Sequence, residues 1–398
     1  MTQSNTAPSD LATAVLPPGT TILQVLPALG HGGVERGTIE VALAIVRAGG
    51  RALVASAGGP NVSRLERVGA EHIQLPLASK KPWTILANRK RLREVIRREN
   101  VSLVHARSRA PAWSAGPAAR AEDVPFVTTY HGSYNERSWL KNRYNRIMVS
   151  SDRVIAISHF IANLIRQRYS TPDCKIRVIH RGADLTQFCP EAVSPARLLK
   201  LQNQWGIRDD TRVILLPGRI TRWKGQAVLV EALSLLRKQR DLLGIAIVFA
   251  GDARGKDAYR KELLTQVRRH GFPPGTALFP GHCDDMPAAM QLAEIVLSTS
   301  IEPEAFGRVM AEAGALGKPV IATNIGAAPE IVLPGETGWL VPPGNAAELA
   351  RVLGEALTMT DDQRAAYRNL SMARVRDEFS VEAMCARTLD VYQELLAR

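Results

Sequence analysis

Short apolar runs bounded by glycine, proline or polar residues recur along almost the whole chain, with amphipathic stretches between them. They form two series: 21–26, 52–56, 103–105, 126–130, 154–157 and 176–180, then 213–216, 245–250, 277–280, 295–298, 320–322 and 339–341. Continuous apolar strands that alternate with helices are typical of parallel sheets covered on both faces. At 398 residues the chain is also about twice the length of a typical domain. The sequence therefore predicts an α/β protein with two doubly wound Rossmann-like domains that face a central cleft.

This pattern divides the chain into four segments. Residues 1–19 lack a basic start and a continuous apolar block, so we expect a flexible tail and no secretory signal. Residues 20–190 and 191–378 are the expected N-terminal and C-terminal domains. Residues 379–398 have the apolar spacing of a helix, which we expect to pack back toward the N-terminal domain. Four scattered cysteines and apolar runs far shorter than about 20 residues favour a cytoplasmic location.

The excess of positive charge lies in one half of the chain. The first 190 residues contain 26 Lys and Arg against 13 Asp and Glu, whereas residues 191–398 contain 25 of each kind. A single sign of charge gathered on one domain favours an anionic partner, such as phosphate groups, an acidic membrane surface or nucleic acid. A basic surface that serves only solubility is the alternative.

Two carboxylates and a glycine follow the strand expected at 295–298. Glu304 lies in the loop at the carboxyl end of that strand, and Gly307 with Arg308 would begin the next helix. Glu312 lies one turn after Arg308. Ionised carboxylates accept hydrogen bonds from sugar hydroxyls, and the unpaired amides of a helix start bind anions or oxygen-rich ligands. The alternative is a helix cap formed by Glu304 and a solvated Glu312.

A basic turn follows the first strand of the second domain. It reads Gly218-Arg219-Ile-Thr-Arg-Trp-Lys224-Gly225 and leads into an amphipathic stretch. Arg219 can bind a phosphate with two hydrogen bonds, and Lys224 adds a point charge beside a helix start. Ordinary surface cations of a loop are the alternative.

The first domain has two further candidate features. Gly32 and Gly33 follow its first strand, where glycine lets the backbone approach a ligand closely. Their spacing departs from the dinucleotide fingerprint, and the second strand lacks a ribose-binding acid, which argues against an oxidoreductase. His131 follows the strand at 126–130, where it would donate to developing negative charge, act as a base, or have a structural role.

Taken together, these residues resemble family 4 of the retaining glycosyltransferases, also called group 1, which have the two-domain GT-B fold. The resemblance extends from Thr21 to the end of the chain. Its motifs are the Glu-x7-Glu pair Glu304 and Glu312, Phe306-Gly307, Gly218-Arg219 with Lys224-Gly225, and Gly317-Lys318-Pro319-Val320. The family commonly has Asn-Gly-Val-Asp where this chain has Arg181-Gly182-Ala183-Asp184, so any role of that asparagine is in doubt here.

The resemblance implies that the N-terminal domain meets the acceptor and that the C-terminal domain binds the nucleotide sugar. It also implies which residues form the site. Arg219 and Lys224 would bind the donor diphosphate, and Glu312 would bind the ribose. The implied donor site comprises Gly32, Gly33, Gly218, Arg219, Lys224, His282, Glu304, Phe306, Gly307, Arg308 and Glu312, and the implied catalytic residues are His131, Arg219, Lys224 and Glu304.

The implied reaction is the transfer of a hexosyl unit from a UDP- or GDP-sugar with retention of configuration and without a cofactor. The chain contains no Asp-x-Asp triplet of the kind that holds a divalent cation on a diphosphate, so we also expect no metal. A sugar-nucleotide epimerase of the same fold is the alternative. A phosphorylase would need pyridoxal phosphate, and a nucleic-acid-binding module would leave both glutamates unexplained.

A basic segment at 83–98 suggests the acceptor. Its cations, preceded by Lys80 and Lys81, and its apolar residues suit a helix that lies on anionic lipid. We therefore expect a peripheral enzyme at the inner face of the cytoplasmic membrane, acting on a lipid-linked acceptor of a surface glycan such as lipopolysaccharide core. The alternative is an ordinary sheet-covering helix with a basic solvent face.

Overall fold

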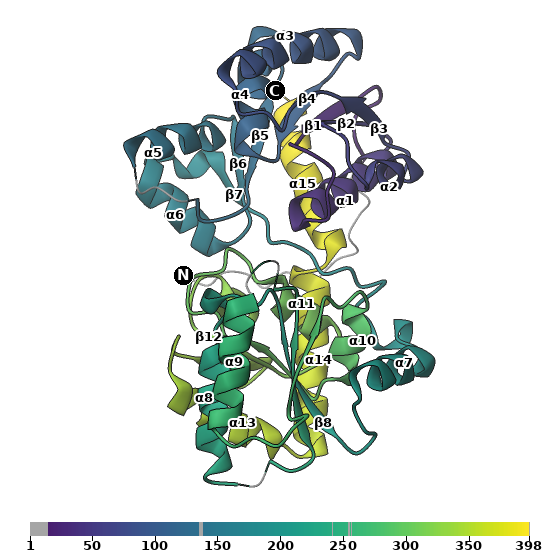
Figure 1. The fold of residues 1–398 in the computed structure, drawn as a ribbon. Helices are drawn as coiled ribbons and strands as arrows, with labels where there is room; N and C mark the ends of the chain where they lie inside the picture. The colour runs from purple at the N-terminus through teal and green to yellow at the C-terminus, as the bar shows by residue number, and fades with distance from the viewer. Residues whose placement is uncertain (1–14, 135–137, 241, 254, 256, 398) are drawn as a thin grey trace, which may run out of the picture. The chain divides into compact units, whose positions relative to one another are not determined.

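The computed structural model of the chain describes residues 15–134, 138–240, 242–253, 255 and 257–397. The chain forms two compact units (Figure 1). Unit 1 comprises the chain up to Arg181 together with Val381–Arg398, and unit 2 comprises Gly182–Ser380. Each unit contains one parallel sheet with helices around it, so the expected pair of doubly wound α/β folds is confirmed.

Unit 1 is built around a seven-stranded parallel sheet in the order β3-β2-β1-β4-β5-β6-β7 (Figure 1). Its strands are β1 (Thr21–Val25), β2 (Arg51–Ser56), β3 (Glu71–Gln74), β4 (Leu103–Ala106), β5 (Phe126–Tyr130), β6 (Arg153–Ala156) and β7 (Ile176–Val178). Its helices are α1 (Gly33–Arg47), α2 (Val62–Arg67), α3 (Pro82–Arg98), α4 (Arg109–Ala121), α5 (Trp139–Asn145), α6 (His159–Tyr169) and α15 (Val381–Leu396). The C-terminal helix α15 lies beside α1.

Unit 2 is built around a six-stranded parallel sheet in the order β10-β9-β8-β11-β12-β13. Its strands are β8 (Arg212–Pro217), β9 (Ile245–Ala250), β10 (Ala277–Gly281), β11 (Ile295–Ser298), β12 (Val320–Thr323) and β13 (Gly338–Val341). Its helices are α7 (Pro195–Trp205), α8 (Gln226–Arg237), α9 (Asp257–Arg269), α10 (Met286–Leu292), α11 (Arg308–Ala315), α12 (Ala328–Ile331), α13 (Ala346–Leu357) and α14 (Asp361–Glu378).

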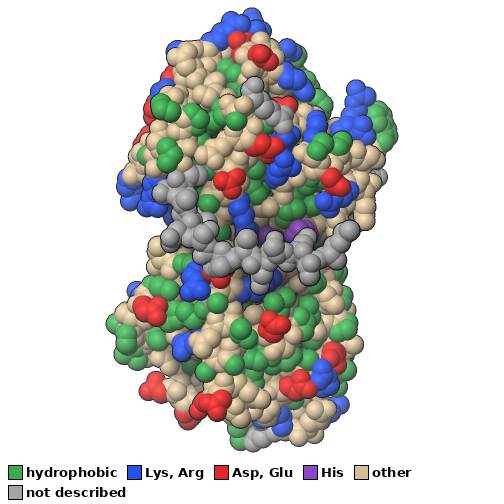
Figure 2. All heavy atoms as spheres, turned by 180° about the vertical axis from the view of Figure 1, so that it is seen from behind, with side chains coloured by type: hydrophobic (Ala, Val, Ile, Leu, Met, Phe, Trp, Pro, Cys, Tyr) green, Lys and Arg blue, Asp and Glu red, His purple; other side chains and the backbone are tan. Residues whose placement is uncertain are grey.

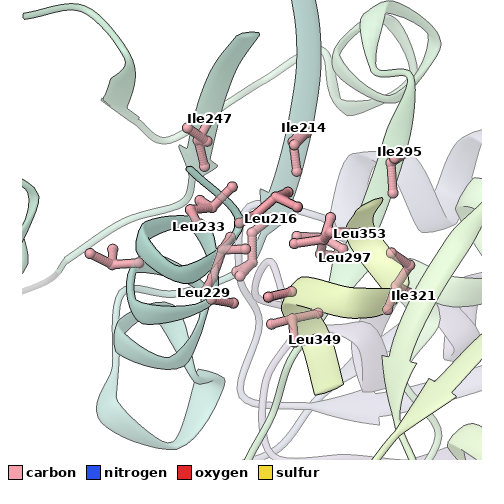
Figure 3. Close-up of a cluster of buried hydrophobic side chains, with 14 of the residues drawn as sticks. Ile214, Leu216, Leu229, Leu233, Ile247, Ile295, Leu297, Ile321, Leu349 and Leu353 are labelled. Carbon is pink, nitrogen blue, oxygen red and sulfur yellow. The ribbon is translucent and has the colours of Figure 1, made fainter. Parts of the chain in front are cut away.

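Buried aliphatic side chains join the sheet of unit 2 to its helices. Figure 3 shows Leu216 of β8 and Leu297 of β11 beside Leu229 of α8 and Leu349 of α13. Each fully buried leucine contributes roughly 1.5–3 kcal/mol relative to an exposed one. The strands are thereby fixed, and with them the loops that leave their carboxyl ends.

The strand order of each sheet reverses at one place. In unit 1 this switch point lies between β1 and β4, and in unit 2 it lies between β8 and β11. Ligands of open parallel sheets bind beyond the carboxyl ends of the strands at such a point. The loops after these four strands are therefore the first places to look for a site.

The N-terminal tail falls partly within the described residues. Residues 1–14 of the expected flexible tail lie outside them. Leu16, in the same segment, is buried, and its N–H donates to the Ala48 carbonyl oxygen at 2.9 Å, so this part of the tail packs on unit 1. Among the described helices, none has the length and apolar character needed to cross a membrane.

Candidate functional site

At the switch point of unit 2, an ammonium group and a carboxylate meet. Lys224 follows β8 and Glu304 follows β11, and the Lys224 Nζ donates to the Glu304 Oε1 at 2.7 Å. The Ser300 hydroxyl donates to the same oxygen. The side chains of Lys224 and Glu304 are 13% and 16% exposed, so solvent screens this pair only in part. We call these three residues the Lys224 cluster.

Two glycines hold the loops of the Lys224 cluster close together. Gly225 has a φ of 73°, and a Cβ there would lie 1.9 Å from the Thr299 carbonyl oxygen. Gly326 has a φ of 65°, and a Cβ there would lie 2.5 Å from the Glu304 carbonyl oxygen. That oxygen also accepts a hydrogen bond from the Ala327 N–H at 3.0 Å. Both positions thus require glycine for its left-handed backbone and for its lack of a side chain.

Gly218 and Arg219 form the turn directly after β8. Gly251, at the end of the neighbouring β9, leaves room for this turn, since a Cβ there would lie 1.9 Å from the Gly218 carbonyl oxygen. The Arg219 side chain is exposed and forms no ion pair with any described carboxylate. An unpaired guanidinium beside the Lys224 cluster is suited to bind an incoming phosphate.

The structure contradicts the alternative roles of the two glutamates, which were a cap of helix α11 for Glu304 and a solvated surface position for Glu312. Gly307, with a φ of 83°, is the N-cap residue of this helix, and no described side chain forms a cap hydrogen bond at this end, so Glu304 does not cap the helix. Glu312 is only 8% exposed and pairs with Arg308 at 2.9 Å, so it is not a solvated surface residue. Phe306 is buried and its ring lies 6.0 Å from that of Phe379.

His282 lies apart from this group. It follows the edge strand β10, two strands away from β8, and its side chain is 71% exposed. Its Nε2 lies 3.3 Å from a carboxylate oxygen of the exposed Asp284. The structure thus brings Lys224, Ser300 and Glu304 together but gives His282 no contact with them among the described residues.

At the switch point of unit 1, the candidate glycines lie at the start of α1. Gly32 is the N-cap residue of that helix, and Gly33 is its first residue. The Gly33 carbonyl oxygen accepts a hydrogen bond from the guanidinium of Arg181, which also approaches the Nδ1 of His131 at 3.2 Å. The structure therefore joins His131 to the glycine segment through an arginine that the sequence analysis did not assign to the site.

The imidazole of His131 is held in its neutral form. Burial lowers the pKa of His131 well below its usual range, and the positive charges of Arg181 and Arg107 act in the same direction. Arg107 is buried and donates to the Gln24 side chain at 2.9 Å and to the Gly37 carbonyl oxygen at 3.0 Å. No described residue gives a hydrogen-bond partner to the buried Nε2 of His131.

Two family descriptions match most of the chain. Glycosyltransferase Family 4 matches residues 31–187, and Glycosyl transferases group 1 matches residues 199–371. Among the curated relatives, a D-inositol 3-phosphate glycosyltransferase of Xylanimonas cellulosilytica is 28% identical over 303 residues, which cover 72% of this chain and 71% of that protein.

Solved structures of similar proteins cover almost the whole chain. A glycosyltransferase from Rickettsia africae has a TM-score of 0.86 and 37% identity, covering 95% of this chain and 98% of that one. The Anabaena protein Alr3699/HepE, in complex with UDP and glucose, has a TM-score of 0.78 and 26% identity, covering 94% and 100%. The chain belongs to the family 4, group 1 glycosyltransferases, and its two parallel sheets have the GT-B fold.

Proposed function

We propose that this glycosyltransferase moves a hexosyl unit from a nucleotide-diphosphate sugar to an acceptor, with retention of configuration and without a metal ion. The observation that carries the proposal is the Lys224 cluster at the switch point of unit 2. There an ammonium group, a hydroxyl and a carboxylate converge within hydrogen-bonding distance, and the unpaired Arg219 follows the same strand.

Each of the proposed site residues has a role that its chemistry allows. Arg219 and Lys224 bind the diphosphate and stabilise the charge that grows on it as the sugar leaves. Glu304 accepts hydrogen bonds from the sugar hydroxyls, because an ionised carboxylate is an acceptor only. Glu312 binds the ribose, Gly32 and Gly33 contact the phosphates, and His131 donates toward the transferred sugar.

UDP is the nucleotide we propose, supported by the complex of the Anabaena relative with UDP and glucose. Thermal shift and calorimetry of the protein with UDP, GDP, ADP and their sugars test this choice. We expect selective stabilisation by UDP and UDP-sugars, lost in Glu312→Ala. A folded protein that binds none of these nucleotides would contradict the proposed function.

The absence of a metal requirement and the retention of configuration have separate tests. Turnover that survives chelator treatment supports the role of Arg219 and Lys224, whereas turnover that magnesium alone restores contradicts it. Proton magnetic resonance of the product measures the anomeric configuration, and a β-linked product from an α-linked donor would rule out retention.

We propose that the acceptor is a lipid-linked precursor of a surface glycan, such as lipopolysaccharide core, reached through the first half of α3. Trp83 and Leu86 are 68% and 66% exposed there. Four nearby cations form no ion pair with any described carboxylate: Lys80, Lys81, Arg89 and Lys90. In the second half of α3, Arg93 and Arg97 instead pair with Glu122. Figure 2 shows Lys and Arg side chains gathered with apolar ones at several places on unit 1.

Sedimentation with anionic vesicles at low salt tests this surface. Exposed tryptophan and leucine beside unpaired cations favour binding to an anionic lipid surface. We expect the protein to sediment with vesicles that contain phosphatidylglycerol, and Trp83→Ser with Leu86→Ser to abolish it. Arg97→Gln, which removes a paired cation from the same helix, is the matched control and should sediment normally. A wild-type protein that stays in the supernatant contradicts the lipid contact but leaves the sugar transfer untouched.

A further inference from the structure

Arg181 joins two segments of unit 1 that the proposed function uses separately. Its guanidinium donates to the carbonyl oxygen of Gly33, at the start of α1, and approaches the Nδ1 of His131, after β5, at 3.2 Å. The side chain is only 7% exposed. In the sequence, Arg181 lies 148 positions from Gly33 and 50 positions from His131, so only the folded unit forms these contacts.

The first turn of α1 is shaped to receive this guanidinium. Gly33 and Gly37 are four positions apart and therefore lie on one face of the helix. A Cβ at Gly37 would lie 2.8 Å from the Nη2 of Arg181, which is closer than real Cβ contacts. The helix thus carries no side chain where Arg181 crosses it. Glycine inside a helix lowers stability by about 0.5–1 kcal/mol relative to alanine. At Gly37 this loss is offset by the contact with Arg181, which a Cβ would block.

The contact with Arg181 decides which nitrogen of His131 carries the proton. A guanidinium has donors and no acceptor, so the Nδ1 that faces it must accept and must be unprotonated. In a neutral imidazole the proton then resides on Nε2. This nitrogen is buried and has no hydrogen-bond partner among the described residues. An N–H held in this way costs free energy until a ligand oxygen accepts from it.

A second buried histidine of unit 1 shows the hydrogen-bond partners of an imidazole with a purely structural role. His105 is fully buried, and both of its nitrogens have partners: the Tyr392 hydroxyl lies 2.6 Å from Nδ1 and the Thr129 hydroxyl lies 2.7 Å from Nε2. His131 differs because one nitrogen faces a cation and the other faces no described group. This difference indicates that the Nε2 of His131 is available to a ligand.

We propose that Arg181 is a positioning residue, which holds His131 in the neutral Nε2–H tautomer so that this N–H donates to an oxygen of the transferred sugar. The proposal rests on the proposed function for the identity of the ligand, but its statement about the imidazole stands on the geometry of unit 1. This tautomer excludes His131 as a general base, because its Nδ1 accepts a hydrogen bond from Arg181 and its Nε2 already carries a proton.

The surroundings of His131 support a neutral ring over the whole working range of pH. In the part of the chain that the structure describes, the charged groups that act on it are Arg181 and Arg107, and the neighbouring titratable groups are His105 and Tyr134. Burial is the first cause of the lowered pKa of His131, and the two guanidinium charges add to it. No carboxylate of the described residues contributes to this shift.

Nitrogen magnetic resonance of the full chain with labelled histidine tests the tautomer directly. His131→Gln assigns the signal of this ring. We expect the wild-type ring to remain the neutral Nε2–H tautomer from about pH 5.5 to about pH 8. In Arg181→Gln we expect the signal to exchange between tautomers. The pKa of His131 should rise only part of the way toward its ordinary value, because burial, the first cause of the shift, and the charge of Arg107 remain. A wild-type Nδ1–H tautomer, or a signal unchanged by Arg181→Gln, would overturn the proposal.

Kinetics and control variants distinguish a positioning role of Arg181 from a role in folding, and from the question of which substrate binds. We expect Arg181→Gln to lower kcat by about tenfold to a hundredfold, less than the loss of a direct donor, and to acquire an acid limb in its pH profile. Arg181→Lys should restore part of both, since it keeps one charged donor. Arg153→Gln removes another buried guanidinium of unit 1, which pairs with Glu394, and should leave the His131 signals unchanged. If the tautomer is as expected but no nucleotide sugar binds, the proposed function fails and the role of Arg181 in fixing the ring stands.

Discussion

At the scale of single residues, the two cations of one short turn have different surroundings. Lys224 pairs with Glu304, and both side chains are largely buried. Arg222, two positions earlier, is 69% exposed and pairs with Glu262 at the surface. An exposed pair contributes about 0–1 kcal/mol, whereas removing one partner of a largely buried pair leaves an uncompensated charge. The turn therefore contains a largely buried cation, which we propose binds the diphosphate, and an exposed one that serves as its matched control.

We predict that Lys224→Met lowers kcat/KM by on the order of a hundredfold to a thousandfold, because it removes a cation that, in the proposed function, stabilises the leaving diphosphate. It should also weaken UDP binding in calorimetry. Arg222→Gln should change neither quantity by more than about twofold, as expected for an exposed pair. Equal losses in the two variants would show that the turn acts through its total charge and not through the Lys224 cluster.

The buried histidines of unit 1 predict how stability depends on pH. Burial lowers the pKa of both His105 and His131 well below the usual range. Below about pH 6.5 the unfolded chain binds protons at these rings while the folded chain does not. The free energy of unfolding should therefore fall as the pH falls from 7 to 5, by at most about 1.4 kcal/mol per pH unit for each histidine.

Thermal unfolding of unit 1 between about pH 7 and about pH 5 measures this dependence, above the range in which most carboxylates titrate. His131→Gln should make the dependence shallower. A melting temperature of unit 1 that stays constant or rises on acidification would contradict the neutral state of these rings.

The sequence singled out loop residues of the candidate site but not the side chains that contact them. Glu304, Lys224 and Arg219 stand out because charged residues follow buried strands. Arg181 and Ser300 do not stand out, because their significance comes from contacts made only in the fold. Gly37 reads as an unremarkable helix residue until the guanidinium beside it is known.

At the scale of elements, the apolar runs predicted twelve strands of the two sheets, and β3 was missed. This strand reads Glu-His-Ile-Gln, and none of its residues is fully buried. It pairs with β2 at the edge of the sheet, where one side of the strand has no neighbour and little apolar surface is needed. A rule that looks for buried strands cannot find a polar edge strand.

The loop that contains Gly326 provides the third prediction, since it supports the backbone of Glu304. Gly326→Ala would place a Cβ 2.5 Å from the Glu304 carbonyl oxygen and strain a left-handed backbone. We expect kcat/KM to fall by at least about tenfold through displacement of Glu304. Gly335→Ala is the matched control, because Gly335 has a φ of 82° with nothing within 4 Å of a Cβ. It should cost about 1 kcal/mol of stability and leave activity unchanged.

At the scale of the whole molecule, the two units are not consecutive pieces of the chain. The chain leaves unit 1 after Arg181, forms unit 2, and returns to unit 1 with α15. Tyr392 of this helix is fully buried, with its hydroxyl 2.6 Å from the Nδ1 of His105, and Glu394 pairs with Arg153 and Arg177. Helix α15 therefore belongs to the core of unit 1.

This path predicts that deleting residues 381–398 removes the cooperative unfolding of unit 1 while unit 2 still unfolds as a unit. The deletion exposes the apolar surface of α1 beside α15, and it removes the α15 partners of buried His105 and Arg153. Differential scanning calorimetry should show the loss of one transition, and UDP should still shift the other. Glu382→Gln, on an exposed position of α15, is the control and should retain both transitions. Two intact transitions after the deletion would mean that the sheet of unit 1 and its other helices fold without α15.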